Sequence, residues 1–207
     1  MITSSEYNKL INELKPVTCL AISKRRAIAE ILQIYDYGQR HFGENYLQEL
    51  IDKAKQLPQK DIVWHFTGRI QRKKCRQIAA VADWVHSINN IEQLELLSKA
   101  RPSHKPPLNC CLQVIPDSFA HEYAVKLSQV SELLVALPGI NIVGLMAMPE
   151  PRTRLEQRSE IFTEVAAFAN QVWPQPVLSM GMSADYQIAI AAGANLVRLG
   201  SVLFSSK

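Results

Sequence analysis

Hydrophobic and polar positions follow two spacings along almost the whole chain. Short apolar runs bounded by polar residues predict buried strands, and apolar residues three or four positions apart predict helices. The runs predict eight strands, at residues 17–22, 40–42, 62–66, 84–88, 108–115, 140–146, 176–178 and 194–199. The helical spacing predicts intervening helices at residues 25–35, 44–56, 71–82, 91–100, 121–137, 153–173 and 183–192, and one extra helix at residues 4–15.

Strands that alternate with helices predict a parallel sheet, because each crossover returns the chain to the same edge. Eight such units can close into a barrel. An open doubly wound sheet is the alternative, and it often carries a G-x-G-x-x-G turn that this sequence lacks. We therefore predict an α/β fold: a single (β/α)8 TIM barrel over residues 1–207, with an extra N-terminal helix.

Composition and charge narrow the choice of ligand only slightly. The chain has 207 residues, of which 47% are hydrophobic, enough for a sizeable core. Its formal net charge of +4 permits an anionic ligand such as a phosphate. Much of the excess lies in the basic cluster at residues 69–76, which has no interleaved aromatic residues. We expect a solvated helix face there and no nucleic-acid partner.

The cysteines and the opening residues bear on the compartment. The four cysteines are Cys19, Cys75, Cys110 and Cys111. They form no Cys-x-x-Cys pair, and no histidine spacing suits a zinc site. The chain does not open with a basic segment and an apolar core, as a signal peptide would. No apolar run approaches the roughly 20 residues of a membrane span. We expect a cytoplasmic protein with reduced thiols and no membrane partner.

The most suggestive single residue is Lys24, directly beyond the first apolar run. The active site of a β/α barrel lies at the carboxyl ends of its strands. A lysine held in a partly dry place there has a lowered pKa, and its neutral amine is the nucleophile that Schiff-base chemistry needs. The alternative is an ordinary solvated lysine at a strand end.

Two later turns could bind a phosphate. Residues 178–185 pass from strand to helix through a Gly–Ser turn, where backbone N–H groups and the Ser183 hydroxyl would face an anion. Gly200 and Ser201 follow the last strand, and the glycine would let the backbone approach a ligand closely. The alternatives are a helix N-cap for Ser183 and a plain strand exit for Gly200.

Arg198 lies inside the last apolar run and needs an acceptor, which could be a structural salt bridge. A lysine amine, two phosphate turns and an arginine across one barrel mouth together suggest pyridoxal phosphate (PLP). Lys24 would take the aldehyde, and Arg198 would face the ring nitrogen. Because an arginine stays protonated, that nitrogen would stay unprotonated and the ring would be a poor electron sink.

Five strings resemble the YggS/PROSC family of pyridoxal phosphate homeostasis proteins. They are Ala-Ile-Ser-Lys at 21–24, Gly-Gln-Arg-His-Phe-Gly-Glu-Asn-Tyr at 38–46, Trp-His-Phe-Thr-Gly at 64–68, Ser-Met-Gly-Met-Ser at 179–183 and Val-Arg-Leu-Gly-Ser at 197–201. The resemblance implies a monomeric barrel like the N-terminal domain of alanine racemase. It implies a Schiff base on Lys24 and a role in vitamin B6 balance without established turnover, with PLP-dependent apoenzymes as possible recipients. The implied cofactor contacts are Ser183, Gly200 and Ser201 at the phosphate, Arg198 at the ring nitrogen, and Asn45 and His65 lining the pocket.

The sequence departs from the family pattern at three places. Arg25-Arg26-Ala27 stands where the family commonly has Thr-Lys-Pro, and Gly68-Arg69 replaces Gly-Pro. The fifth-strand string, normally Asn-x-Asn, is not recognisable in residues 113–119. Two other functions remain open: a racemase-like enzyme, for which Tyr46 or Tyr186 would have to supply the second acid/base, and a barrel that has lost its ligand. Racemisation requires an acid/base on each face of the substrate, and at 207 residues we expect no second domain that could supply one.

Overall fold

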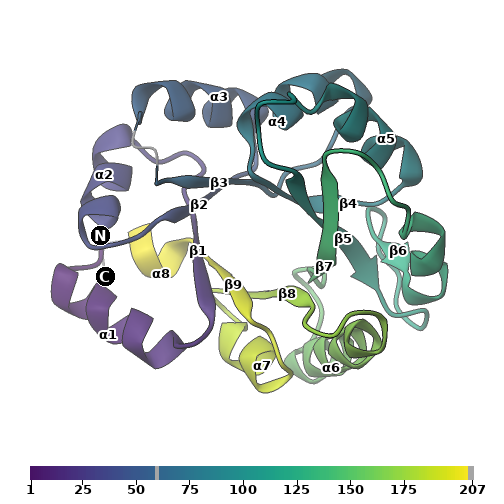
Figure 1. Cartoon of the computed structure of the whole chain (residues 1–207). Coiled ribbons are helices and arrows are strands. Elements are labelled where there is room, and N and C mark those ends of the chain that lie inside the picture. The colour runs from purple at the N-terminus through teal and green to yellow at the C-terminus, as the bar shows by residue number, and fades with distance from the viewer. Residues whose placement is uncertain (59–60, 205–207) are drawn as a thin grey trace.

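The computed structural model describes residues 1–58 and 61–204, and its parallel strands close into a barrel (Figure 1). Neighbouring strands pair in the order β4-β3-β2-β1-β9-β8-β7-β5, and a further β4–β5 pairing closes the ring. The predicted α/β barrel is therefore confirmed. The strands are β1 Thr18–Ile22, β2 His41–Glu44, β3 Val63–Phe66, β4 Trp84–Ile88, β5 Leu108–Ile115, β7 Ile140–Ala147, β8 Val177–Met182 and β9 Leu196–Leu199.

Helices surround the barrel and cover the outer faces of its strands (Figure 1). They are α1 Ser4–Leu14, α2 Ile28–Asp36, α3 Leu47–Gln56, α4 Cys75–Val81, α5 Ile91–Ala100, α6 Leu155–Val172, α7 Tyr186–Ala191 and α8 Ser201–Phe204. The extra N-terminal helix is present as α1, which Thr3 and Glu6 cap reciprocally. The backbone N–H of Ile2 donates to the carbonyl of Leu203 at 3.2 Å, which joins the two ends of the described chain.

Side chains alternate between the helices and the barrel interior, as a period of two requires. A Cβ atom built on Gly43 would meet the side chains of Leu20 and Ile22, so these residues share the inner face. His86 on β4 contacts Ser179 on β8 at 2.9 Å, and these strands are not neighbours. That contact crosses the barrel, so the interior is a packed polar and apolar core.

The helix predicted at residues 121–137 is wrong. The structure has a two-residue strand β6, Val125–Lys126, and a 3-10 helix, η2, Leu127–Leu133. The buried residues Leu127, Val130 and Leu133 recur every three positions, which is the repeat of a 3-10 helix. Lys126 Nζ donates to the carbonyls of Asp117 and Phe119, and these bonds replace regular helix contacts before the 3-10 turn.

Several further boundaries differ from the sequence prediction, among them the starts of α2 and α3, which come three residues later than predicted. β8 continues to Met182, four residues past its predicted end, and α7 begins at Tyr186 instead of residue 183. The predicted helix at residues 71–82 is split into a 3-10 turn, η1 Arg72–Lys74, and α4. The short helix α8 was not predicted. Four residues are too few for an amphipathic pattern to identify.

Candidate functional site

The turn that carries Lys24 is anchored on both sides. Lys24 is exposed, and the buried Ser23 before it donates its hydroxyl to Glu44 Oε1 at 2.6 Å. The backbone N–H of Arg25 donates to Glu49 Oε2 at 2.7 Å. Arg25 has a φ of 59°, in the left-handed region that a side chain disfavours. The turn is thus fixed by side chains of β2 and α3.

A buried lysine connects the two carboxylates under this turn. Lys53 Nζ donates to Glu44 Oε1 and to Glu49 Oε2, each at 2.8 Å, and to the Ser23 carbonyl at 2.7 Å. Glu44 is fully buried, and burial raises the pKa of its carboxyl group. Glu44 Oε2 has no hydrogen-bond partner among the described residues. Lys53 is therefore the cation that holds this buried carboxylate and the Lys24 turn together.

The two predicted phosphate turns come together in the structure. The backbone N–H of Gly200 donates to Ser183 Oγ at 3.3 Å, which links the turn after β8 to the turn after β9. The position of Ser183 shows that the N-cap alternative is wrong and that the helix starts later than predicted. It lies in a turn two residues before Asp185, the N-cap position of α7, so it neither starts nor caps that helix. Asp185 instead accepts from the Met182 N–H at 2.6 Å.

Lys24 lies beside these turns because β1 and β9 are neighbours. Ala21 pairs with Leu199, which places Ile22 next to Gly200 and the following turn next to Ser201. A Cβ atom on Gly200 would lie 3.6 Å from the Ile22 carbonyl oxygen and 3.7 Å from Ile22 Cβ, both ordinary contacts. The fold itself therefore does not require a glycine at position 200.

Arg198 is a buried cation at the end of β9. It is 4% exposed, and burial lowers its pKa to about 10, so it stays protonated at neutral pH. Its guanidinium donates to the Ser179 carbonyl at 2.5 Å, to Ser179 Oγ at 2.9 Å and to the Ala147 carbonyl at 3.0 Å. Within the described part of the chain it has no carboxylate ion pair, so the salt-bridge alternative is wrong.

The remaining two predicted residues differ in depth. Asn45 follows β2, and its side-chain oxygen accepts from Thr67 Oγ1 at 3.1 Å. His65 is not beyond the end of β3 but within it, fully buried in the interior between His41 and His86. The structure thus brings Lys24, Ser183, Gly200 and Ser201 to one part of the mouth, with Asn45 further along the rim and His65 deeper.

Sequence patterns did not identify the supporting residues Lys53, Ser179 and His86. Lys53 lies among polar residues of an amphipathic helix, where a lysine is ordinarily solvated. The available indication for His86 is its position two residues from Trp84 in an apolar strand, which gives it the inward face. Nothing in the spacing pairs it with Ser179, 93 residues later.

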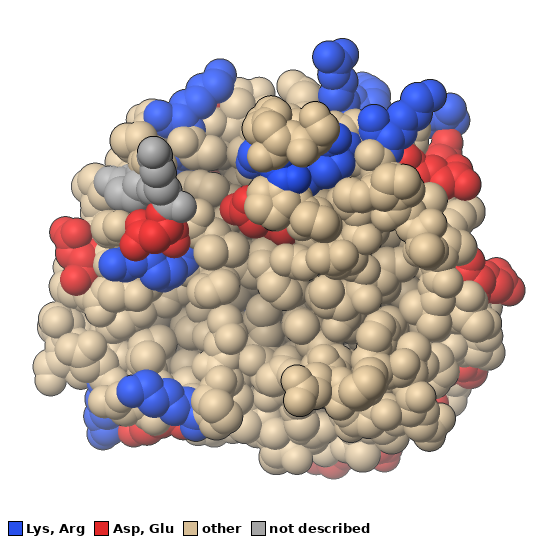
Figure 2. Space-filling model, viewed as in Figure 1, with Lys and Arg blue, Asp and Glu red and all other residues tan. Residues whose placement is uncertain are grey.

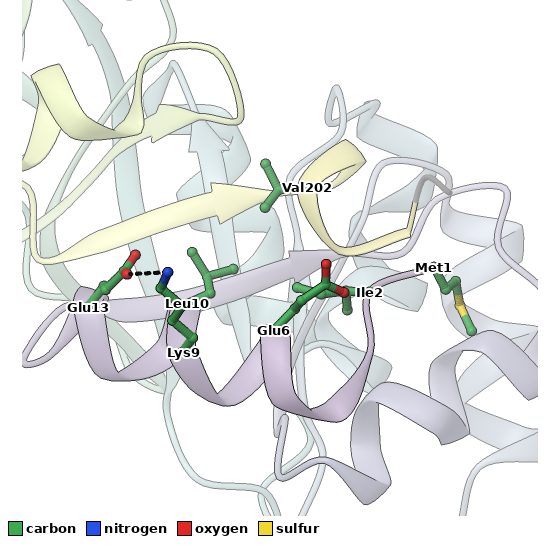
Figure 3. A pocket seen from close by; sticks show the side chains of 7 residues that line it. All are labelled: Met1, Ile2, Glu6, Lys9, Leu10, Glu13 and Val202. Carbon is green, nitrogen blue, oxygen red and sulfur yellow. Dashed lines mark ion pairs between the residues drawn. The ribbon is translucent and has the colours of Figure 1, made fainter. Parts of the chain in front are cut away.

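A separate hollow lies between α1 and Val202 (Figure 3). Its volume is about 430 Å³, and it is lined by Met1, Ile2, Glu6, Lys9, Leu10, Glu13 and Val202. None of the predicted cofactor contacts lines this hollow.

The basic cluster lies at the surface with partners of its own. Arg72 pairs with Glu92 at 2.6 Å, and the Arg69 guanidinium lies 4.4 Å from the centre of the Tyr123 ring. Figure 2 shows lysines and arginines along the top and at the lower left of one face, acidic residues along its right edge, and a centre made mostly of uncharged residues. Of the described helices, none is long and apolar enough to cross a bilayer. No group of three or more His, Cys, Asp or Glu among the described residues could hold a metal ion.

Comparison with known proteins agrees with this geometry. The family model described as "Alanine racemase, N-terminal domain" matches residues 5–207. A pyridoxal phosphate homeostasis protein of Vibrio cholerae is 38% identical over 202 residues, which cover 92% of this chain and 86% of the relative. This chain belongs to the pyridoxal phosphate homeostasis protein family. The family resemblance predicted from the sequence is therefore confirmed.

Solved structures place the pyridoxal phosphate homeostasis protein family within a wider fold. PipY of Synechococcus elongatus, solved with PLP bound, superposes with a TM-score of 0.85 at 30% identity, over 98% of this chain and 100% of PipY. Alanine racemase of Corynebacterium glutamicum superposes with a TM-score of 0.74 at 14% identity, over 99% of this chain and 60% of the racemase. The second likeness shows the shared barrel fold.

Proposed function

We propose that this barrel binds PLP at its mouth, on Lys24, and serves intracellular PLP homeostasis without catalytic turnover. The observation that carries the proposal is the Gly200 N–H to Ser183 Oγ hydrogen bond beside the β1 turn. This bond joins the turns after β8 and β9 into one polar site. The site lies next to the turn that carries Lys24, because β9 pairs with β1. The names of the relatives and the PLP bound to PipY support the same ligand.

Each residue would have a separate role in binding. Ser183, Gly200 and Ser201 would contact the phosphate, and Arg198 would face the ring nitrogen. Asn45 is the remaining proposed contact, at the rim. His65 lies in the interior with both ring nitrogens bonded to other histidines, so it would act on the cofactor only through them. Lys24 would condense through its amine with the cofactor aldehyde, releasing one water and forming a Schiff base.

The residues present fit this cofactor. The protein does not need a glycine at position 200, and a phosphate approaching the backbone would account for it. Arg198 is buried without a carboxylate, so an acceptor from a ligand would complete its hydrogen bonding.

The same arginine favours a carrier over an enzyme. A protonated guanidinium leaves the ring nitrogen without a proton, which makes the bound cofactor a weak electron sink. The hydroxyl of Tyr46, one candidate second acid/base, accepts from the Arg25 guanidinium at 3.4 Å and keeps its own proton. We propose a monomer over residues 1–207 that acts in the cytoplasm, where its four buried thiols stay reduced, and passes PLP to apoenzymes.

Borohydride trapping tests the anchor. Protein incubated with PLP and reduced with borohydride should carry the reduced cofactor on the Lys24 peptide, as read by mass spectrometry. The Lys24→Ala variant should lose this label, whereas Lys99→Ala, at an exposed position on α5, should keep it. Label on another lysine in the unmodified protein would contradict the proposal.

A turnover assay tests the carrier role. Incubation of the PLP-loaded protein with L-amino acids should yield no more than a stoichiometric amount of any product. Sustained formation of D-amino acids would favour the racemase-like enzyme instead.

A further inference from the structure

Three histidines form a continuous series through the barrel interior, and the proposed binding role uses only one of them. His41 Nδ1 lies 2.9 Å from His65 Nε2, and His65 Nδ1 lies 2.8 Å from His86 Nε2. His86 Nδ1 lies 2.9 Å from Ser179 Oγ, which also accepts from Arg198 at 2.9 Å. The series therefore runs from β2 to the arginine on β9.

The far end of the series opens on a cavity at the amino-terminal end of the barrel. This cavity has a volume of about 330 Å³, and His41, His65, Trp84 and Asn195 are among the residues that line it. His41 is half-buried, whereas His65 and His86 are fully buried. Burial lowers the pKa of all three, that of His86 to about 3. Each ring is thus neutral at pH 7 and carries one N–H.

Arg198 sets the direction of the hydrogen bonds. A guanidinium has no acceptor, so Arg198 can only donate to Ser179 Oγ. The Ser179 hydroxyl has one proton, and the acceptor that the described residues offer it is His86 Nδ1. The reverse direction would point two donors at Ser179 and leave its buried hydroxyl proton unpaired, at a cost of roughly 1–3 kcal/mol.

Neutral rings then leave one arrangement for the remaining protons. With Nδ1 accepting, His86 carries its proton on Nε2 and donates to His65 Nδ1. His65 Nε2–H donates in turn to His41 Nδ1, which leaves the His41 Nε2–H as the last donor of the series. Every accepting nitrogen faces toward Arg198, so the three ring dipoles present their negative ends to a buried cation that lacks a carboxylate.

We infer that His86, His65 and His41 are positioning residues: a one-way hydrogen-bond chain, all in the Nε2–H tautomer, that orients Ser179 and through it Arg198. The assignment of the three tautomers is a property of the protein without cofactor. The consequence for PLP rests on the proposed function, because it requires Arg198 to face the ring nitrogen.

The first test uses the cofactor-free, unmodified protein. Histidine ring ¹⁵N–¹H NMR at neutral pH should show the Nε2–H tautomer for His41, His65 and His86. His104, which is exposed, serves as the internal reference for a ring in exchange with solvent. An Nδ1–H tautomer at His65 or His86 would overturn the inference, whether or not the protein binds PLP.

The second test measures whether the series of histidines positions Arg198. His86→Leu removes the acceptor of the Ser179 hydroxyl, and we expect PLP affinity to fall about tenfold, the equivalent of one hydrogen bond. His86→Gln offers an amide oxygen in its place and should recover most of that loss, and His104→Leu should change nothing. Borohydride should still label Lys24 in all three variants.

The outcomes separate the two proposals. Equal PLP affinity in His86→Leu and the unmodified protein would contradict the positioning role. Absence of PLP binding by the unmodified protein would contradict the proposed function and leave the tautomer result to be judged alone.

Discussion

Two glycines at the barrel mouth serve different purposes. A Cβ atom on Gly68 would lie 1.9 Å from the backbone oxygen of Asn45, so the fold itself excludes a side chain there. A Cβ atom on Gly200 would make only ordinary contacts with Ile22. Packing explains the first glycine but not the second, and a phosphate at the proposed site would account for the glycine at position 200.

Substituting each glycine by alanine should separate these purposes. We expect Gly200→Ala to change the free energy of unfolding by less than about 0.5 kcal/mol, yet to weaken PLP retention clearly. Gly68→Ala should lower the free energy of unfolding by about 1–3 kcal/mol, because the backbone of Asn45 must move. Urea unfolding of the cofactor-free proteins measures the first quantity, and equilibrium dialysis with PLP the second. A Gly200→Ala variant that unfolds easily, or that retains PLP normally, would contradict this assignment.

Single residues at the mouth could be predicted where chemistry follows a strand directly. Lys24 and Gly200 could be placed at the mouth because each comes just after an apolar run, and parallel strands end on the same side. The contact between Ser183 and Gly200 could not be predicted, since it depends on how far β8 continues. A polar serine and a glycine within residues 179–182 interrupt the apolar run, so the hydrophobic pattern does not predict the second half of that strand.

At the scale of elements, α3 supports the β1 turn through Lys53. This lysine holds a fully buried glutamate and the carbonyl of Ser23, and it lies on a helix that otherwise packs through leucines. Removing one partner of a buried ion pair leaves the other charge uncompensated, which costs more than the pair contributes. The turn that carries Lys24 should therefore depend on a residue outside the proposed cofactor contacts.

The variant Lys53→Met tests this dependence. Because Glu44 is left buried without its cation, we expect the free energy of unfolding to fall by about 3–5 kcal/mol. Lys55→Met, two residues along α3 and exposed, should change it by less than about 0.5 kcal/mol. Urea unfolding at neutral pH measures both. Replacing Glu44 by Gln in the Lys53→Met background should restore part of the loss; similar unfolding of the two lysine variants would show that the buried pair adds nothing.

The segment at residues 121–137 shows where element prediction fails. Its leucines and valines are spaced closely enough to suit either a helix of 3.6 residues per turn or one of three. Asp117 stabilises the start of the observed 3-10 helix, because its carboxylate accepts from the backbone N–H of Ser128 at 3.1 Å and from its hydroxyl at 2.5 Å. A bond between residues 11 positions apart leaves no periodic trace in the sequence.

For the whole molecule, the buried histidines predict a loss of stability in acid. The unfolded chain binds a proton at His86 below its ordinary pKa of 6.5, whereas the folded protein excludes it until about pH 3. The pKa of His65 is lowered in the same direction. Stability should therefore fall as pH drops from about 6.5 toward 3, by about 1.4 kcal/mol per pH unit for each such histidine.

Urea unfolding at several pH values measures this slope. The His86→Gln variant should show a slope smaller by about 1.4 kcal/mol per pH unit over the acidic range. Burial raises the pKa of Glu44, which acts in the opposite direction, but the comparison cancels it because both proteins contain that residue. Parallel slopes would show that His86 is protonated in the folded protein.

The barrel could be predicted from the sequence, because this prediction requires only the order of strands and helices. Eight apolar runs alternating with helical patterns leave few topologies, and the right-handed crossover rule leaves fewer. The side-chain contacts inside the barrel could not be predicted, since His86 and Ser179 meet across the barrel between strands that are not neighbours. Register around a closed sheet, not spacing along the chain, decides which inward side chains meet.

The hydrogen bond between Ile2 and Leu203 has a practical consequence for anyone who handles this protein. It holds both ends of the described chain on the side of the barrel where β1 and β9 finish. An affinity tag or fusion partner attached at Met1 would start beside Val202, next to the Gly200–Ser201 turn, and would crowd it. The loop at residues 101–107, which leads into β5 from the opposite side of the barrel, is the better place for an inserted label or for new chain ends.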